Sequence, residues 1–315
     1  MSSPAERALA HVRGLHPTPG PPGLFDRAPI TVAFHPDRLL AGGGTVAERL
    51  AAEGVYRSQF ETGISNGGLG GDRDRWEQRM FAGAYTSPAG RPIYGALNLA
   101  GYPDGAAPRF GSCHLVLATA VSARATFSHG DSVTEPTAVG TASTFGAVWA
   151  ELLRSVAEHG RALNQPADTP AAWVAALAVA RTAPGRALDD YVEAQVHGGV
   201  RLPGDVTAVV ADPSFAGTPF EPLLRRLGPA LRWSPGFRLA PSDFPADLRG
   251  PSVPPLAESI ARRYASPLLD AELIGRAARE HAADPDTLQL IKYLWHILVL
   301  RGRPAADGAG RPARP

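Results

Sequence analysis

The sequence predicts an α+β fold with a mixed or antiparallel β core, flanking helices and a helical C-terminal region. Three observations support this. Short apolar stretches bounded by Gly and Pro fill the middle of the chain, segments with helical spacing flank them, and helices punctuated by proline replace them beyond about residue 215. We therefore expect an N-terminal helix and Pro/Gly-rich joint over 1–30, an α+β core over 31–217, a helical region over 218–302 and a disordered Ala/Gly/Pro/Arg tail over 303–315.

The elements follow from periodicity and end signals. Ser143 is the expected N-cap and Gly160 the C-cap of one helix, because apolar residues repeat at helical spacing between them. The expected helices are Pro4–Val12, Thr45–Glu53, Arg73–Met80, Ser143–His159, Ala171–Arg181, Leu256–Tyr264, Leu268–Ala283 and Pro285–Leu300. The expected strands are ITVAF near residue 30, Val55–Glu61, Tyr94–Leu99, Phe110–Ala118, Ala125–His129, Tyr191–His197 and Asp205–Val210.

Composition narrows the class of protein. The 315 residues, 44% hydrophobic, can bury a substantial core, and a net charge of +1 argues against binding to nucleic acid or to anionic membranes. All basic residues except Lys292 are arginine, which is typical of GC-rich coding and is not by itself a phosphate signal. With Cys113 as the single cysteine, no apolar leader and no apolar run near 18 residues, we expect a cytoplasmic protein without a membrane span.

Two of the expected strands carry polar side chains on one face. Alternation along VYRSQFE places Arg57, Gln59 and Glu61 together, and alternation along YVEAQVH does the same for Glu193, Gln195 and His197. Three polar groups in a row are costly to bury unpaired, so such a face borders either solvent or a cleft. We expect both faces to converge on one cleft.

The first polar strand runs into a loop rich in glycine, TGISNGGLGG, which contains Asn66. Arginine binds oxyanions through two donors, and glycine permits close approach of the backbone. The candidate phosphate-binding residues are therefore Arg57, Gln59, Glu61 and Asn66. The alternative is an Arg57–Glu61 ion pair on an edge strand beside an ordinary turn.

Two further clusters contain histidine. In FGSCH, Ser112 and His114 share a strand face and could polarise a ligand, while Cys113 on the opposite face is expected in the core. In FSHGDSVTE, His129 and Asp131 could form a general base with its orienting partner, or Asp131 could cap local backbone amides in a turn. The spacing matches no strong metal motif, so no metal site is predicted.

Long strings in the chain resemble a known family. VYRSQFETGISNGG, DRWEQRMFAGAY, RPIYGALNL, PRFGSCHLVL and EAQVHGGV resemble an uncharacterised bacterial family catalogued as domain of unknown function 3626, from about His35 to Gly217. This resemblance implies no established activity.

A second similarity concerns the order of motifs. An arginine in an early Y-R strand, a strand closed by Thr or Ser and an E-x-Q strand are similar in order to the Arg, Ser and Glu motifs of ADP-ribosyltransferases. This resemblance implies that Arg57 holds the phosphates of a dinucleotide, that Thr126 or Ser128 takes the serine position, and that Glu193 or Gln195 marks the catalytic strand. The chain has no S-T-S string, and its E-x-Q strand carries glutamine at the second E-x-E position.

The leading hypothesis is an NAD-dependent ADP-ribosyltransferase or NAD glycohydrolase, in which Glu193 and His197 stabilise the developing positive charge and orient the acceptor. The alternative enzyme is a nucleotidyl or phosphoryl transferase that uses ATP with Mg²⁺, with His129 as base and Asp131 as metal ligand. The alternative from another class is a binding protein whose cleft holds a small ligand or peptide without catalysis. The expected partners are a small nucleotide and an unidentified acceptor.

Overall fold

The computed structural model describes residues 2–63, 68–185 and 188–305. Its centre is an eight-stranded sheet in the order β12-β11-β4-β1-β3-β9-β5-β6, in which only β11 and β12 pair in parallel. The strands are β1 Ile30–Phe34, β2 Val55–Tyr56, β3 Ile93–Leu97, β4 Cys113–Leu117, β5 Ala125–His129, β6 Val139–Thr141, β7 Arg161–Ala162, β8 Gln165–Pro166, β9 Val192–Val196, β10 Val200–Arg201, β11 Val206–Ala211 and β12 Leu231–Trp233. The expected α+β class with a mixed sheet is confirmed.

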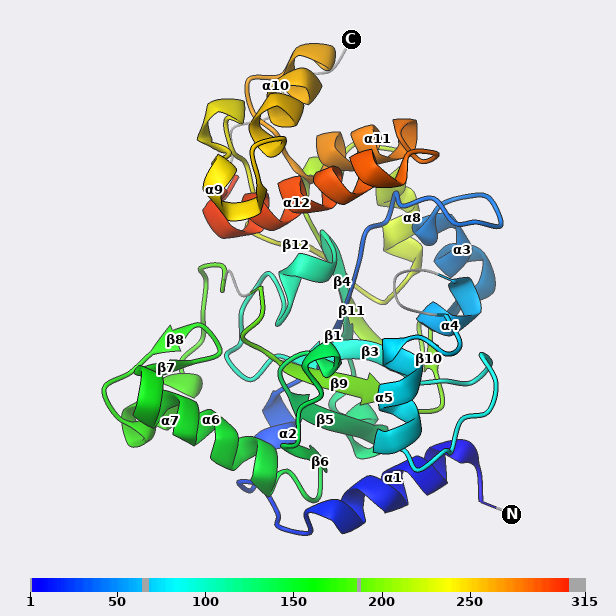
Figure 1. Ribbon diagram of the computed structural model, residues 1–315, viewed down its shortest axis with the longest axis vertical. Helices are drawn as coiled ribbons and strands as arrows, with labels where there is room; N and C mark the ends of the chain where they lie inside the picture. Colours follow the sequence, from blue (N-terminus) through cyan, green and yellow to red (C-terminus); the bar gives the residue numbers. More distant parts are fainter. Residues whose placement is uncertain (1, 64–67, 186–187, 306–315) are drawn as a thin grey trace.

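Helices surround this sheet (Figure 1). The last four gather at one end of the molecule, and α1 crosses the opposite end. The helices are α1 Pro4–Leu15, α2 Leu24–Arg27, α3 Val46–Glu53, α4 Gln59–Thr62, α5 Asp72–Met80, α6 Gly146–His159, α7 Pro170–Leu177, α8 Phe220–Arg226, α9 Ala246–Arg249, α10 Val253–Arg263, α11 Ala271–Glu280 and α12 Pro285–Arg301. The C-terminal region is thus helical as expected, and it also contributes strand β12 to the edge of the sheet.

The two faces of the sheet differ where β3, β9 and β5 run side by side. One face carries apolar side chains such as Phe127 and Ala194, and α6 packs on it through Val148 and Leu152. The other face carries polar side chains and lies against α5, whose Glu77 accepts a hydrogen bond from the β3 residue Tyr94. Burial of the apolar face supplies most of the stabilisation of this layer, since the hydrophobic effect scales with the apolar area removed from water.

The expectation of a strand over Val55–Glu61 is wrong. Only Val55 and Tyr56 are extended, and they pair with β10. Ser58 then begins helix α4, because its hydroxyl accepts from the Glu61 amide while the Glu61 carboxylate accepts from the Ser58 amide. This reciprocal cap is the S-x-x-E capping box, which favours a helix start over continued strand.

Other differences are at element ends. Helix α6 begins after Phe145 instead of at Ser143, although Gly160 ends it in the left-handed conformation as expected. Phe110 belongs to a short 3-10 helix, η1 (Pro108–Phe110), that precedes β4. No helix within the described ranges combines the length and the hydropathy needed to cross a membrane.

Candidate functional site

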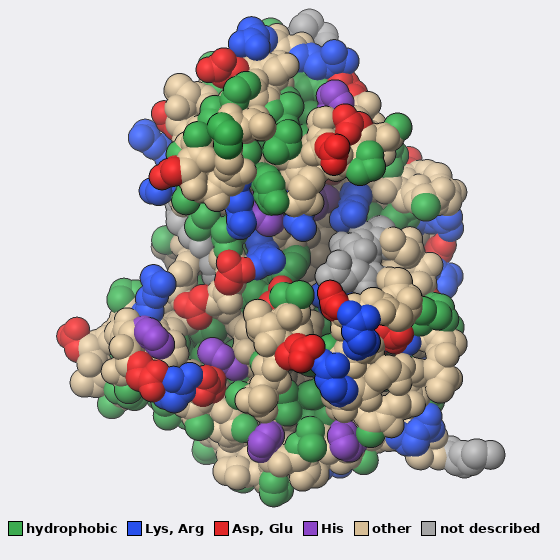
Figure 2. Space-filling model, in the orientation of Figure 1, with side chains coloured by type: hydrophobic (Ala, Val, Ile, Leu, Met, Phe, Trp, Pro, Cys, Tyr) green, Lys and Arg blue, Asp and Glu red, His purple; other side chains and the backbone are tan. Residues whose placement is uncertain are grey.

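A cavity of about 790 Å³ opens beside the polar side of the sheet. Its wall is built from β1, α3, α4, α5, β3, β9 and the loop around Ser87. Figure 2 shows the molecule hollowed between the C-terminal helices and the body that contains the sheet, with Lys, Arg and His side chains around the hollow. The cavity volume falls within the range of about 300–1,000 Å³ that is typical of small-molecule sites.

The register of the sheet fixes which polar side chains share the face below α5. Tyr94 of β3 lies opposite Gln195 of β9, and Ser128 of β5 lies opposite Glu193. Directly paired residues in an antiparallel ladder project to the same side. Tyr94 and Glu193 therefore lie on one face, and both line the cavity.

Glu193 is a buried carboxyl group in the wall of this cavity. Its Oε1 accepts hydrogen bonds from the Gln195 side-chain amide at 3.0 Å and from the Ser132 backbone amide at 3.3 Å. The pKa of Glu193 is raised to about 7, mainly by burial; the charge of Asp131 adds to this rise, and the charge of Arg73 opposes it. A carboxyl group with a pKa near neutrality can both accept and donate a proton at physiological pH.

Arg73 of α5 also lines the cavity, and its charge acts on Glu193. Its guanidinium lies 4.1 Å from the centre of the Tyr94 ring, and its Nε and Nη1 atoms are buried without a hydrogen-bond partner among the described residues. Burial lowers the pKa of Arg73, but Tyr94, Glu193 and Asp131 together leave it above its usual value. Arg73 is thus charged and has donors to offer a ligand.

Arg91 shows what a structural arginine looks like in this region. It is 1% exposed, and its guanidinium contacts Asp74 at 2.6 Å, Glu77 at 2.9 Å and the Ser87 carbonyl at 2.9 Å. These bonds fix α5 to the loop before β3. The contrast with Arg73 is informative, because proteins rarely leave a buried guanidinium without acceptors unless a ligand or water supplies them.

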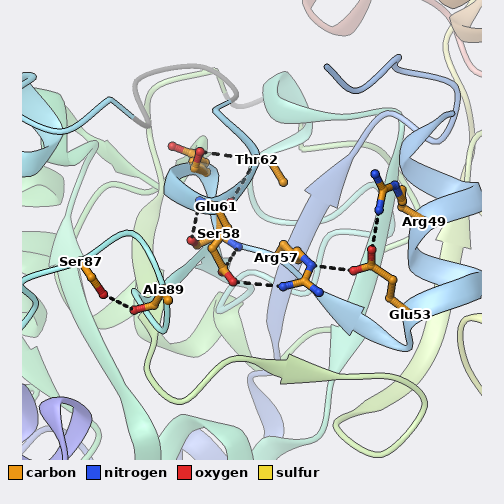
Figure 3. Close-up of polar contacts among 9 residues, drawn as sticks. Arg49, Glu53, Arg57, Ser58, Glu61, Thr62, Ser87 and Ala89 are labelled. Atoms are coloured by element: carbon orange, nitrogen blue, oxygen red, sulfur yellow. Dashed lines mark hydrogen bonds and ion pairs between the residues drawn. The ribbon is translucent and has the colours of Figure 1, made fainter. Parts of the chain in front are cut away.

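Arg57, Gln59 and Glu61 also line the cavity, so the structure brings these residues and Glu193 to one site. Arg57 is 50% exposed, however, and its guanidinium already contacts Glu53 at 2.6 Å and Glu61 at 3.3 Å (Figure 3). The expected alternative of an Arg57–Glu61 ion pair is therefore present. Gln59 differs from Arg57, since its buried Oε1 has no partner among the described residues.

Gln195 and His197 lie in the core beneath this face and do not line the cavity. The Thr126 hydroxyl donates to Gln195 Oε1 at 2.8 Å, and the His197 ring nitrogens contact Tyr85 Oη at 2.6 Å and Thr126 Oγ1 at 3.1 Å. Burial lowers the pKa of His197 to about 3, so its ring is neutral at pH 7. The expected open polar face of β9 is thus a buried hydrogen-bond network, and only its Glu193 end reaches the cavity.

His129 and Asp131 do not form the expected pair. The electrostatic neighbours of His129 are Glu151, Asp190 and Arg154, on the side of the sheet that α6 covers, and burial lowers its pKa. Asp131 instead accepts a hydrogen bond from the Val133 backbone amide at 3.0 Å, which is the turn cap that the sequence offered as the alternative. No three His, Cys, Asp or Glu side chains of the described ranges lie close enough together to hold a metal ion.

Ser112 and His114 are placed outside the cavity wall. Ser112 Oγ lies 3.2 Å from His35 Nδ1, and His35 itself lines the cavity. His114 is buried, which lowers its pKa to about 4, and Gly105 packs against its ring so closely that a Cβ there would lie 3.1 Å from Nδ1. Cys113 lies in the core as expected. Asn66 falls outside the described residues.

The sequence reasoning missed Arg73 and Tyr94 as site residues. Both were placed in the correct elements, a polar helix and a β strand. The signal that marks them is three-dimensional, since Arg73, Arg75 and Arg79 share one helix and only Arg73 faces the cavity.

A comparison with known families gives one match. The model of a family described as a protein of unknown function, DUF3626, matches residues 29–301, which extends the resemblance through the C-terminal helices. No curated protein matches the chain.

Proposed function

We propose that this chain, which belongs to the DUF3626 family, is a nucleotide-dependent transferase, with NAD as its leading substrate, whose cavity joins a phosphate-binding Arg73 to a catalytic Glu193. The reaction is transfer of ADP-ribose to an acceptor or to water. One observation carries the proposal: a charged guanidinium with unpartnered buried donors lies beside a carboxyl group of near-neutral pKa in one cavity.

The phosphate role moves from Arg57 to Arg73. Two carboxylates neutralise Arg57, whereas Arg73 has no ion pair within the described ranges and rests on the Tyr94 ring. A guanidinium held against an aromatic ring is oriented before the ligand arrives and offers two parallel donors, which match the oxygens of a phosphate. A pyrophosphate bound there would satisfy the free Arg73 donors.

Glu193 would act at the ribose carbon. When the bond between C1′ and the nicotinamide nitrogen breaks, its electron pair leaves with neutral nicotinamide, and positive charge develops on the ribose. Ionised Glu193 stabilises that charge. The acceptor oxygen or nitrogen then bonds to C1′, and its proton passes to Glu193, whose pKa of about 7 suits proton transfer at neutral pH.

The test is release of nicotinamide from NAD in the presence of EDTA, by the wild type and three variants. Glu193→Gln keeps the shape but removes the charge, and Arg73→Met removes the guanidinium. Arg75→Met is the matched control, because Arg75 lies on the same helix but is exposed and pairs with Asp72. We expect Glu193→Gln to lower turnover by at least about a hundredfold and Arg73→Met mainly to raise KM, with Arg75→Met unchanged.

Three outcomes would contradict the proposal. Full activity of Glu193→Gln would remove Glu193 from the chemistry. Labelling of a partner from ATP only when Mg²⁺ is present would favour the phosphoryl transferase. A rise in melting temperature with NAD but no nicotinamide release under any condition would favour a binding protein without catalysis.

A further inference from the structure

A group of four cations and one histidine gathers at the C-terminal side of the cavity, and burial lowers the pKa of that histidine, His296, to about 3, so its ring is neutral at pH 7. Helix α12 contributes Lys292 and, one turn later, His296. Arg249 comes from α9, and Arg109 comes from η1. Arg38, in the wall of the cavity after β1, completes the group. We call these five residues the basic cluster. Figure 2 shows Lys, Arg and His side chains gathered below the C-terminal helices, where the molecule is hollowed.

Aromatic contacts hold the basic cluster together. Trp295 of α12 donates a hydrogen bond to the Pro108 carbonyl at 3.0 Å, which fixes α12 to η1 next to Arg109. The Arg249 guanidinium lies 5.4 Å from the ring centre of Tyr293, between Lys292 and His296 in the sequence. The ring of His35, in the cavity wall, packs edge-on against Trp295 with centroids 5.1 Å apart. The cluster therefore adjoins the cavity.

The basic cluster is short of negative charge. Arg38, Arg249 and Lys292 have no ion pair with a carboxylate in the described ranges, and only Arg109 contacts acids, Asp189 closely and Asp131 at 3.7 Å. Burial and the charges of Arg109, Arg38 and Arg249 lower the pKa of Lys292. Like charges held together repel each other, so this arrangement costs free energy in the absence of an anion.

Two atoms in the basic cluster lack a partner among the described residues. His296 is only 4% exposed, and its Nδ1 is buried without a hydrogen bond. The Nε of Arg109 is likewise buried without a hydrogen-bond partner. Buried polar atoms in native proteins are nearly always satisfied. An anion at this place would accept from Arg109 Nε and from neutral His296 with its proton on Nδ1, and it would reduce the repulsion among Arg38, Arg109, Arg249 and Lys292.

We propose that the basic cluster is a second phosphate subsite, which binds a phosphate group of the cavity's ligand that is separate from the group held by Arg73. The inference rests on the proposed function in that one nucleotide occupies both subsites, and it narrows the substrate class to nucleotides with an additional phosphate, such as NADP. The two subsites share no residue, so each can be removed alone. Arg73 lies on α5, whereas the basic cluster lies on α12, α9 and η1 and includes Arg38 after β1.

The test compares binding of NAD and NADP by calorimetry. The double variant Lys292→Gln/Arg249→Gln removes two charges of the cluster. Lys292 is exposed and Arg249 is half-buried, so both can be replaced without opening the core. Arg262→Gln/Arg263→Gln on α10 is the control of equal charge, because both arginines are exposed. We expect wild type and control to bind NADP at least about tenfold more tightly than NAD, the cluster variant to bind both equally, and Arg73→Met to weaken both alike.

A second arm decides the inference even if neither dinucleotide binds. Inorganic tripolyphosphate should raise the melting temperature of the wild type and of Arg73→Met, and the cluster variant should not show this rise. A separate double variant, Lys292→Arg/Arg249→Lys, keeps both positive charges and should show the rise again. Measurable but equal binding of NAD and NADP to the wild type would overturn the inference, as would an NADP preference that survives in the cluster variant. Absence of a tripolyphosphate effect in the wild type, or its equal loss in the α10 control, would also overturn it. Failure of nicotinamide release alone would overturn only the proposed function.

Discussion

Replacement of Glu193 by glutamine should change how the stability of the protein depends on pH. Glutamine has the same shape, and its side-chain oxygen can still accept from the Gln195 amide and the Ser132 backbone amide, which both bond to Glu193 Oε1. The packing and these bonds should therefore survive. The variant lacks only the titrating proton.

The magnitude follows from the pKa of Glu193, about 7 in the folded protein against an ordinary value of 4.5. Because the folded value is raised, the native state binds the proton more tightly, and the stability from that proton is fully present below pH 4.5 and lost as the pH rises through 7. The difference between the two pKa values corresponds to about 3 kcal/mol. The charged neighbours of Glu193, Arg73 and Asp131, remain in the variant.

The assay is chemical denaturation of wild type and Glu193→Gln at pH values from 4.5 to 8.5. We expect the two proteins to be similarly stable at the acidic end and the variant to be more stable by up to about 3 kcal/mol at pH 8.5. Glu77, whose pKa burial also raises to about 7, titrates in both proteins and cancels in the difference. Parallel stability curves would show that Glu193 is ionised normally and would refute the reasoning about its proton transfer.

Three further outcomes are expected. Arg73→Met should keep or raise the melting temperature, because it removes a buried guanidinium with unpartnered donors, and a fall of more than a few degrees in thermal melts would show that Arg73 is structural. Arg57→Lys should change turnover less than about tenfold, since two carboxylates already engage Arg57; a loss as large as that in Arg73→Met would return the phosphate role to Arg57. Gly111→Ala should lose more than about 2 kcal/mol in denaturant unfolding, because its Cβ would lie 2.3 Å from the Phe34 backbone nitrogen, while Gly14→Ala, with no heavy atom within 4 Å, serves as the neutral control.

Much of the fold could be predicted from the sequence, because its signals are local. The strand over Ala125–His129 has the expected bounds, and α12 follows the expected pattern from Pro285 to within one residue of its end. Apolar periodicity and end signals suffice for such elements. The difference at Val55–Glu61 has a local cause as well, since the S-x-x-E capping box at Ser58 and Glu61 starts a helix where alternation alone predicts a strand.

Less of the site could be predicted from the sequence, because the site depends on which polar groups already have hydrogen-bond partners in the fold. The three polar residues of YVEAQVH look equivalent in the sequence. In the structure, Gln195 accepts a hydrogen bond from Thr126 and His197 contacts Tyr85, so only Glu193 reaches the cavity. These partners lie 69 and 112 residues away in the sequence. No spacing rule indicates them.

The arginines show the same limit. Arg57 was conspicuous in the sequence because acids and amides surround it, yet those acids are what neutralise it. Arg73 is functional in our account because it has no acid partner in the described ranges, and an unpaired donor is a property of the folded structure.

We propose that Arg73 holds the phosphates of a nucleotide beside Glu193. The most direct measurement is calorimetric binding of ADP-ribose, which carries the pyrophosphate but cannot release nicotinamide, to the wild type, Arg73→Met and Arg75→Met at one salt concentration. We expect Arg73→Met to lose at least about tenfold in affinity, whereas Arg75→Met should bind as the wild type does. Equal affinity of all three proteins, or no binding by the wild type, would contradict it.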